Sequence, residues 1–279
     1  MIPELANFIL ILSMSLFFGT SLLGIYARKI ESARIIIKPL FTNANLLLLA
    51  SFALLIYLAV TDNFSVKYIA SHSNSSLPVF YKISSIWSAH EGSMFLWIVL
   101  LGSWSLLFVR NNYKTDLYIT DVLIILSSIL FLFTAFLIFT SNPLDRVLPL
   151  SPIDGADINP ILQDPGLAIH PPMLYMGYVG FVIPFAAALA NLTSSSTHAW
   201  EKSVKRWTLA AWAFLTAGIG LGSAWAYYEL GWGGYWFWDP VENIALLPWL
   251  CGTALVHAMA VSSKTSNLKR SEEHTSELQ

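Results

Sequence analysis

Hydrophobic residues fill seven long stretches of the chain, and polar residues are largely confined to the segments between them. Each stretch has close to the roughly 20 residues that an α-helix needs to cross a bilayer. Because lipid offers no hydrogen-bond partner to a free backbone group, we predict an all-α, polytopic membrane protein in which every stretch is a helix. The predicted transmembrane helices are 5–26, 41–60, 93–110, 121–140, 172–190, 207–228 and 243–262.

Lysine and arginine are divided unevenly between the connecting segments. If the segments are assigned alternately to two sides of the membrane, one side holds twelve of the 15 basic residues and the other holds three. Basic residues accumulate on the cytoplasmic side of membrane proteins, so the N-terminus is predicted outside and the C-terminus inside. The longer loops 61–92, 141–171 and 229–242 then lie on the outer side, which is the periplasm in a Gram-negative cell.

Composition supports a membrane location and narrows the chemistry. Hydrophobic residues make up 56% of the 279 residues and charged residues only 11%, against about 25% in an average domain. A formal net charge of −2 argues against a nucleic acid partner. The single cysteine, Cys251, excludes an intrachain disulfide, a CxxC redox pair and a thiolate metal cluster. The N-terminus lacks signal-peptide features, so we expect the first apolar segment to be retained.

The last outer loop is unusually aromatic, reading WAYYELGWGGYWFWDPVEN over residues 225–243. Its rings offer large flat faces with a polar edge, and its glycines let the backbone approach a flat partner. This combination favours a planar, apolar ligand with polar edges, such as a tetrapyrrole. An aromatic belt at the membrane interface is the alternative, although belts are usually less dense. The candidate ligand platform consists of Trp232, Tyr235, Trp236 and Trp238.

A helix start follows directly after the platform. Asp239 matches an N-cap, and Pro240 matches the first helical position. Glu242, three residues after the N-cap, matches the acidic residue of a capping box. We therefore expect Asp239 and Glu242 to cap the seventh helix. Contact between Asp239 and a bound ligand is a second role that the sequence leaves open.

Two of the six histidines are candidate haem ligands, because neutral imidazole is a common axial ligand of haem iron. His170 is predicted at the outer end of the fifth span, on the same side as the aromatic loop. His257 is predicted roughly 21 Å deep in the seventh span, where a buried ionisable residue suggests function. A neutral histidine bonded to a neighbouring helix is the alternative there. Since the predicted depths differ by roughly 20 Å, the two cannot bind one iron, and two separate sites are predicted.

Several segments resemble a known family. Residues 232–243, WGGYWFWDPVEN, resemble the tryptophan-rich WWD signature of the haem-handling proteins of cytochrome c assembly. The segments 87–92, 163–178 and 221–228 resemble one branch of them, the CcmF-type haem lyases and their nitrite-reductase paralogues. Tyr235 stands where tryptophan is more usual and keeps a flat ring with a donor.

The resemblance implies a haem lyase, or holocytochrome c synthase, working within a complex in the bacterial or mitochondrial inner membrane. Haem would arrive on the periplasmic chaperone CcmE, rest on the platform and be joined to the CxxCH thiols of apocytochrome c, with a CcmH-type protein as thiol partner. His170 matches the family's periplasmic haem ligand. His257 matches a transmembrane histidine that holds a permanent haem b.

The resemblance also implies a division of the chain. Residues 1–86 form a transmembrane hairpin with its outer loop, 87–264 the haem-handling domain, and 265–279 a polar tail. Family members are longer, so the second axial ligand of each histidine is expected outside this sequence. Residues 270–279, RSEEHTSELQ, resemble a translated sequencing adapter, which indicates a gene fragment; a naturally split protein is the competing interpretation.

Three other functions stay open at this point. The nitrite-reductase paralogue would perform the same chemistry on a different haem motif. A haem export or delivery module would bind haem without attaching it. A solute transporter with an aromatic-lined pore would need no iron, but the sequence shows no intramembrane acid–base relay.

Overall fold

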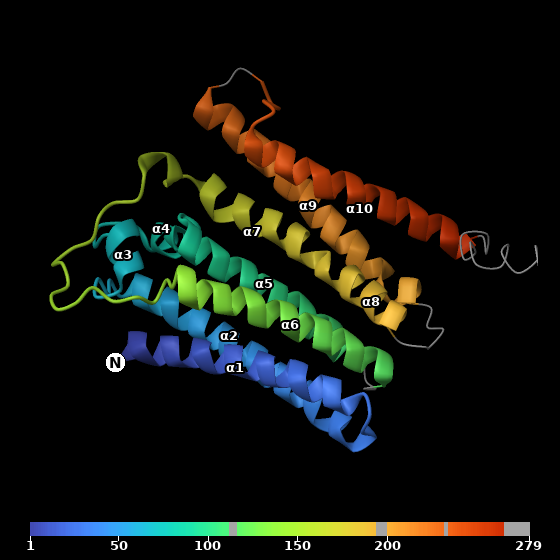
Figure 1. The fold of residues 1–279 in the computed structure, drawn as a ribbon. Helices are drawn as coiled ribbons and strands as arrows, with labels where there is room; N and C mark the ends of the chain where they lie inside the picture. Colours follow the sequence, from blue (N-terminus) through green and yellow to red (C-terminus); the bar gives the residue numbers. More distant parts are fainter. Residues whose placement is uncertain (112–115, 194–199, 232–233, 265–279) are drawn as a thin grey trace, which may run out of the picture.

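The computed structural model describes residues 1–111, 116–193, 200–231 and 234–264, and its long helices lie side by side as a bundle (Figure 1). Seven helical segments within these residues are long and apolar enough to cross a membrane. Each overlaps one predicted span, so the prediction of an all-α, seven-span membrane protein is confirmed. The segments are Ile2–Ala27, Glu31–Val60, His90–Arg110, Leu117–Thr140, Pro165–Thr193, Trp200–Glu229 and Pro240–Val261.

Two helices share the fifth span. Between α7 and α8 the helix is interrupted at Phe181, because Pro184 has no amide N–H to donate to the Gly180 carbonyl. The α-helices are α1 Ile2–Ala27, α2 Arg34–Val60, α3 Lys67–His72, α4 Val79–Ser84, α5 His90–Arg110, α6 Leu117–Thr140, α7 Pro165–Gly180, α8 Val182–Thr193, α9 Trp200–Leu230 and α10 Pro240–Lys264. The 3₁₀ turns are η1 Glu31–Ala33, η2 Ser85–Trp87 and η3 Pro160–Leu162.

The start of α7 differs from the prediction. The outer loop was expected to continue to residue 171 because its prolines disfavour helix, but the helix already begins at Pro165. Asp164 caps it by accepting a hydrogen bond from the Gly166 amide at 2.6 Å, and Pro165 occupies a first-turn position whose N–H would be unpaired anyway. His170 therefore lies within the helix, in its second turn.

Pro171 and Pro172 lie inside α7, where each removes one helical hydrogen bond. The missing N–H of Pro171 leaves the Leu167 carbonyl without its usual partner. The indole N–H of Trp87, from η2, donates to that carbonyl at 2.7 Å. A side chain from the segment before α5 thus stabilises the turn that carries His170.

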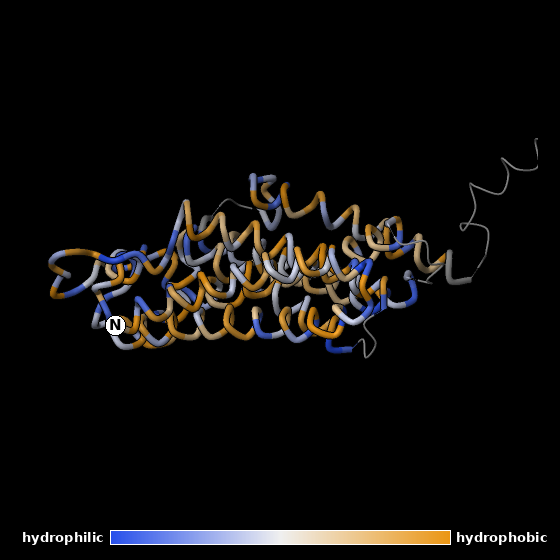
Figure 2. Tube along the Cα trace, turned by 60° about the horizontal axis from the view of Figure 1, so that its bottom comes forward, coloured by the Kyte–Doolittle hydropathy of each residue, from blue (hydrophilic) through white to orange (hydrophobic). Residues whose placement is uncertain are grey.

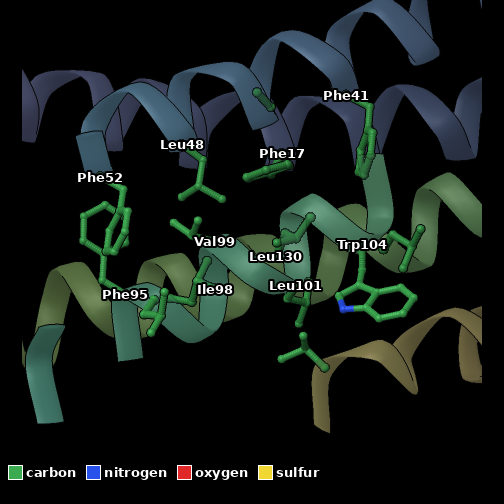
Figure 3. Packing of buried hydrophobic residues seen from close by; sticks show 14 of the residues in the cluster. Phe17, Phe41, Leu48, Phe52, Phe95, Ile98, Val99, Leu101, Trp104 and Leu130 are labelled. Atoms are coloured by element: carbon green, nitrogen blue, oxygen red, sulfur yellow. The ribbon is translucent and has the colours of Figure 1, made fainter. Parts of the chain in front are cut away.

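The helices form two groups (Figure 1). In one group, α1, α2, α5 and α6 share an apolar core, and Figure 3 shows side chains such as Phe17, Leu48 and Phe95 meeting at its centre. In the other, α7 lies along α9, and α10 packs against α9 with its Ala245 in the same apolar cluster as Leu174 of α7. Hydrophobic positions run along the middle of the helices and hydrophilic ones gather toward their ends (Figure 2).

Close contact between α7 and α9 depends on glycine. A Cβ atom at Gly177 of α7 would collide with the backbone of Leu215, and one at Gly218 of α9 would lie 2.5 Å from the Cα of Leu174. Small residues let transmembrane helices approach each other in this way. The approach brings the second turn of α7 against the outer half of α9.

The connecting segments alternate between the two ends of the bundle, as the sequence predicted (Figure 1). One end carries the N-terminus and the segments that follow α2, α6 and α9. Its basic residues are Lys67, Lys82 and Arg146, and the other described Lys and Arg residues belong to the opposite end. The protein is a multi-pass membrane protein, and the end with few basic residues is called the outer end below.

Candidate functional site

His170 lies where α7 meets α9 at the outer end of the bundle. Its ring packs against Gly222, where even a methyl group would collide with it. Its Nδ1 atom lies 2.9 Å from the carbonyl oxygen of Gly218. Since a carbonyl only accepts hydrogen bonds, Nδ1 carries the proton, and the neutral ring keeps its lone pair on Nε2. The imidazole is therefore fixed in the form that can bind a metal through Nε2.

A pocket of about 190 Å³ opens beside this ring, between α7, α9 and the start of α10. Ligand pockets that enclose a whole small molecule are usually about 300–1,000 Å³, so this one holds only one edge of a large flat ligand. Its lining is mostly apolar, with a few polar groups. The lining residues are Ile161, His170, Leu174, Ile219, Gly222, Ser223, Trp225, Ala226, Glu229, Asp239, Val241, Glu242 and Ala245.

Trp225 supplies an unused hydrogen-bond donor in the wall of this pocket. Its ring centroid lies 6.0 Å from that of His170, at an interplanar angle of 55°. The indole N–H is buried and has no hydrogen-bond partner among the described residues. Buried donors are almost always paired in folded proteins, so this N–H is suited to an acceptor brought by water or by a ligand.

Asp239 and Glu242 form the predicted capping box at the start of α10. The Glu242 amide donates to Asp239 Oδ1 at 2.6 Å, and Glu242 Oε2 accepts from the Asp239 amide at 3.4 Å and the Phe237 amide at 2.8 Å. Glu242 is only 8% exposed. The capping prediction is confirmed, and the carboxylate also fixes the end of the aromatic loop next to the pocket.

Two aromatic side chains of the platform lie on the surface, and Trp236 is partly buried. Tyr235 and Trp238 are 55% and 67% exposed, and Trp236 packs edge to face on Trp238 with ring centroids 5.8 Å apart. The hydroxyl of Tyr235 donates to the Gly220 carbonyl at 2.5 Å, which ties the loop to α9. Trp232, the fourth predicted platform residue, lies outside the described residues.

Trp238 has an unusual backbone conformation. Its φ of 60° is in the left-handed region, which bulky residues rarely adopt. The Asn243 side chain donates to the Trp238 carbonyl at 2.8 Å, and Asp239 caps the next residues. The strained conformation turns the exposed indole outward immediately before Asp239, a residue that lines the pocket.

His257 has the same tautomer but a different environment. Its Nδ1 lies 2.9 Å from the Thr253 carbonyl of its own helix, so the lone pair is again on Nε2. The alternative of a histidine bonded to a neighbouring helix is not seen among the described residues, because the side chain is exposed on α10 and bonds its own helix. The same face carries Leu247 and Leu250, which are 65% and 50% exposed. α10 lies at the edge of the bundle, packed against α9 and, at Gly252, against the ring of Phe181.

The two histidines lie at different depths. His170 is five residues past the first residue of α7, and His257 is seventeen residues past the first residue of α10. At 1.5 Å per residue, they lie about 8 and 26 Å from the outer ends of their helices. The difference of about 18 Å keeps them from binding one iron. No cluster of three metal-binding side chains is found among the described residues.

The sequence profile of the family described as "Cytochrome C assembly protein" matches residues 87–272. The chain belongs to this family. It is 46% identical to "Cytochrome c-type biogenesis protein CcmF" of Escherichia coli and 44% identical to "Cytochrome c-type biogenesis protein NrfE" of Haemophilus influenzae. The matches cover 96% and 95% of this chain but only 42% of each relative, so the chain spans less than half of their length.

A solved structure titled "Cytochrome c Heme Lyase CcmF" has the same fold. It superposes with a TM-score of 0.76 at 31% sequence identity, over 92% of this chain and 42% of that chain. The recognition of a CcmF-like member of the cytochrome c assembly family is thus confirmed.

The family implies haem, and the described residues fit it unequally at the two histidines. His170 combines a free Nε2, a pocket and an unpaired indole N–H, which suit the edge of an iron porphyrin with polar substituents. His257 offers a free Nε2 on an open face, and no cluster of three metal-binding side chains includes it among the described residues. The outer histidine fits one axial ligand of a haem, and His257 has no pocket of the same kind around it.

Three residues of this site were not predicted as site residues. Gly218 and Gly222 build the groove that holds His170, and Trp87 completes the turn before it. The spacing of the two glycines, GIGLG, is the small-xxx-small motif of close helix pairs and was a usable signal. Trp87 had no local signal, because its partner carbonyl lies 80 residues away in the sequence.

Proposed function

We propose that this chain is the haem-handling part of a cytochrome c haem lyase, working in a bacterial inner membrane with its aromatic loop in the periplasm. The observation that carries the proposal is the His170 imidazole. Its Nδ1–H is committed to the Gly218 carbonyl and its Nε2 is free beside a pocket next to the aromatic loop. The family membership and the low number of basic residues at the outer end support the same assignment.

In this proposal the outer site binds haem transiently. His170 holds the iron, and the Trp225 N–H donates to a polar edge of the porphyrin. Trp236 and Trp238, with Tyr235 and Trp232, cover one porphyrin face. The apolar pocket walls keep water from the bound edge. The haem supplies vinyl groups, to which the thiols of a CxxCH motif in apocytochrome c add.

His257 would hold a second, permanent haem b within the membrane. Its Nε2 lies on an open helix face, so the second axial ligand comes from a segment outside the described residues. The exposed apolar side chains around it suit a protein partner as well as lipid. The longer relatives contain further chain that can supply such a partner, since this chain covers 42% of them.

The proposed partners follow from this chemistry. A periplasmic chaperone of the CcmE type delivers haem, a CcmH-type protein presents the apocytochrome thiols, and apocytochrome c is the acceptor. The nitrite-reductase pathway is the second candidate, because the identities to CcmF and NrfE, 46% and 44%, do not separate the two. A haem delivery module without lyase activity is distinguished by its failure to modify a CxxCH peptide.

The test is haem binding by the purified chain, followed by absorption spectroscopy and titration. His170→Ala is compared with His72→Ala, a matched control whose Nδ1 also lies 2.9 Å from a backbone carbonyl but away from the pocket. We expect the outer-site Soret band to be lost in His170→Ala and kept in His72→Ala. Equal spectra for the two variants would overturn the assignment of His170.

A further inference from the structure

A second and larger pocket lies at the opposite, inner end of the bundle, between α5, α7 and α9. Its volume is about 880 Å³, within the range of pockets that bind organic ligands. It is separate from the candidate haem site, with which it shares no lining residue. The cytochrome c assembly role proposed above does not use it.

The pocket is charged at its mouth and apolar inside. Lys202 and Arg206 of α9 line it, both are exposed, and neither forms an ion pair with a described residue. None of its described lining residues is acidic. Arginine and lysine without partners at the end of a transmembrane bundle attract anions, and the attraction is strongest at the membrane surface.

Aromatic rings form the walls further in. Trp104 and Phe108 of α5 face Trp207 and Phe214 of α9, and the Trp104 and Trp207 ring centroids are 5.6 Å apart. Phe214 follows Arg206 by eight residues, so it lies about 12 Å deeper in the membrane. The cationic mouth therefore lies at the depth of a phospholipid headgroup, and the apolar interior lies at the depth of its acyl chains.

We infer that this pocket binds one anionic phospholipid of the inner leaflet. The headgroup phosphate lies between Lys202 and Arg206, and an acyl chain runs along the aromatic walls. Charge complementarity selects an anionic headgroup, and the apolar depth selects a lipid over a small free anion. Basic pockets between transmembrane helices on the cytoplasmic side are known to bind anionic lipids in this way.

Native mass spectrometry of the purified chain in a non-ionic detergent tests the inference. Wild type is titrated with phosphatidylglycerol and, separately, with phosphatidylcholine of the same acyl chains. We expect one phosphatidylglycerol to bind with clear preference. Lys202→Gln combined with Arg206→Gln is expected to weaken phosphatidylglycerol binding by about 30-fold, since each surface cation contributes about 1 kcal/mol, or roughly fivefold. Lys205→Gln, on the same helix but outside the pocket lining, is the matched control and keeps the wild-type affinity.

A second variant tests the apolar part. Ala210 also lines the pocket, and Ala210→Phe fills it without changing charge. We expect this variant to lose the bound lipid and to keep its helical circular dichroism. A phosphatidylglycerol with a photoreactive acyl chain, irradiated in membranes with the wild-type chain, should label the α9 peptide that contains Trp207 and Phe214.

Five outcomes overturn the inference. Equal binding of the two lipids, or an unchanged preference in the double variant, would show that the cations do not select the headgroup. If inorganic phosphate displaced the bound phosphatidylglycerol, the pocket would be an anion site. If haemin displaced it, the pocket would be a second porphyrin site. Labelling confined to other helices would place the lipid elsewhere, and it decides the matter even if the charge variants do not fold.

Discussion

The hydrogen bond from Trp87 to Leu167 gives the sharpest test of how the His170 helix turn is built. Trp87→Phe keeps an aromatic ring and removes the N–H that donates at 2.7 Å. The Leu167 carbonyl already lacks its helical partner because residue 171 is proline. The variant therefore leaves a buried carbonyl without any donor, which costs about 1–3 kcal/mol.

Pro171→Ala provides the matched background. It restores an amide N–H at the position that normally donates to the Leu167 carbonyl. In this background the carbonyl keeps one donor after Trp87→Phe, so the loss falls to about 0.5–1.5 kcal/mol, the net value of an ordinary hydrogen bond. The double-mutant cycle should give a coupling of roughly 1 kcal/mol between the two residues.

The assay is equilibrium unfolding of the four proteins in mixtures of dodecyl maltoside and sodium dodecyl sulfate, followed by far-ultraviolet circular dichroism. Haem titration of the same proteins reports whether the turn positions the His170 ring. We expect Trp87→Phe to weaken haem binding more in the proline background than in the alanine background. An equal cost of Trp87→Phe in both backgrounds would refute the idea that Trp87 replaces the bond removed by proline.

Three further perturbations test the outer end of the bundle. Gly222→Ala should weaken haem binding by about fivefold or more in a titration, because overpacking costs about 1–3 kcal/mol. Gly220→Ala should bind as wild type, because its Cβ would meet only the Tyr235 hydroxyl, at an ordinary contact distance of 3.9 Å. Asp239→Ala should lower unfolding stability by about 1 kcal/mol, whereas Asp239→Asn, which still caps, should change it little. Hydrogen bonds from Ser75 lower the pKa of Asp154, so its stabilisation is present at neutral pH and lost on acidification; pH-dependent melting should lose part of this contribution in Ser75→Ala, which removes the hydroxyl and keeps the backbone N–H donors.

The transmembrane helices were predictable because the signal is large and local. A lipid environment forces each apolar stretch to satisfy its own backbone, and the alternating basic residues then fix the order of the ends. The start of α10 was predicted correctly from Asp239 and Pro240. The start of α7 was missed although Asp164 and Pro165 repeat the same pattern, since Pro165 was counted among the prolines that favour an irregular path in the 141–171 loop.

The environment of each histidine was harder to predict. Counting residues gives a depth along a helix, and with the helix bounds of the structure it separates His170 from His257 by about 18 Å. It does not say which neighbouring helix covers a given face. His170 is covered because Gly218 and Gly222 let α9 approach, whereas His257 is exposed because α10 lies at the edge of the bundle. Long-range packing decided both cases.

The outer end of α9 connects every part of the candidate haem site. The Gly218 carbonyl fixes the His170 tautomer, and the Gly220 carbonyl binds Tyr235 of the aromatic loop. Tyr228 donates to Asp164, the residue that caps α7, at 2.6 Å. Because the backbone of one helix holds both the ligand histidine and the platform, their separation is set by the rigid spacing of helical residues. Binding of haem at His170 should therefore change the order of the aromatic loop more than that of α1 and α2.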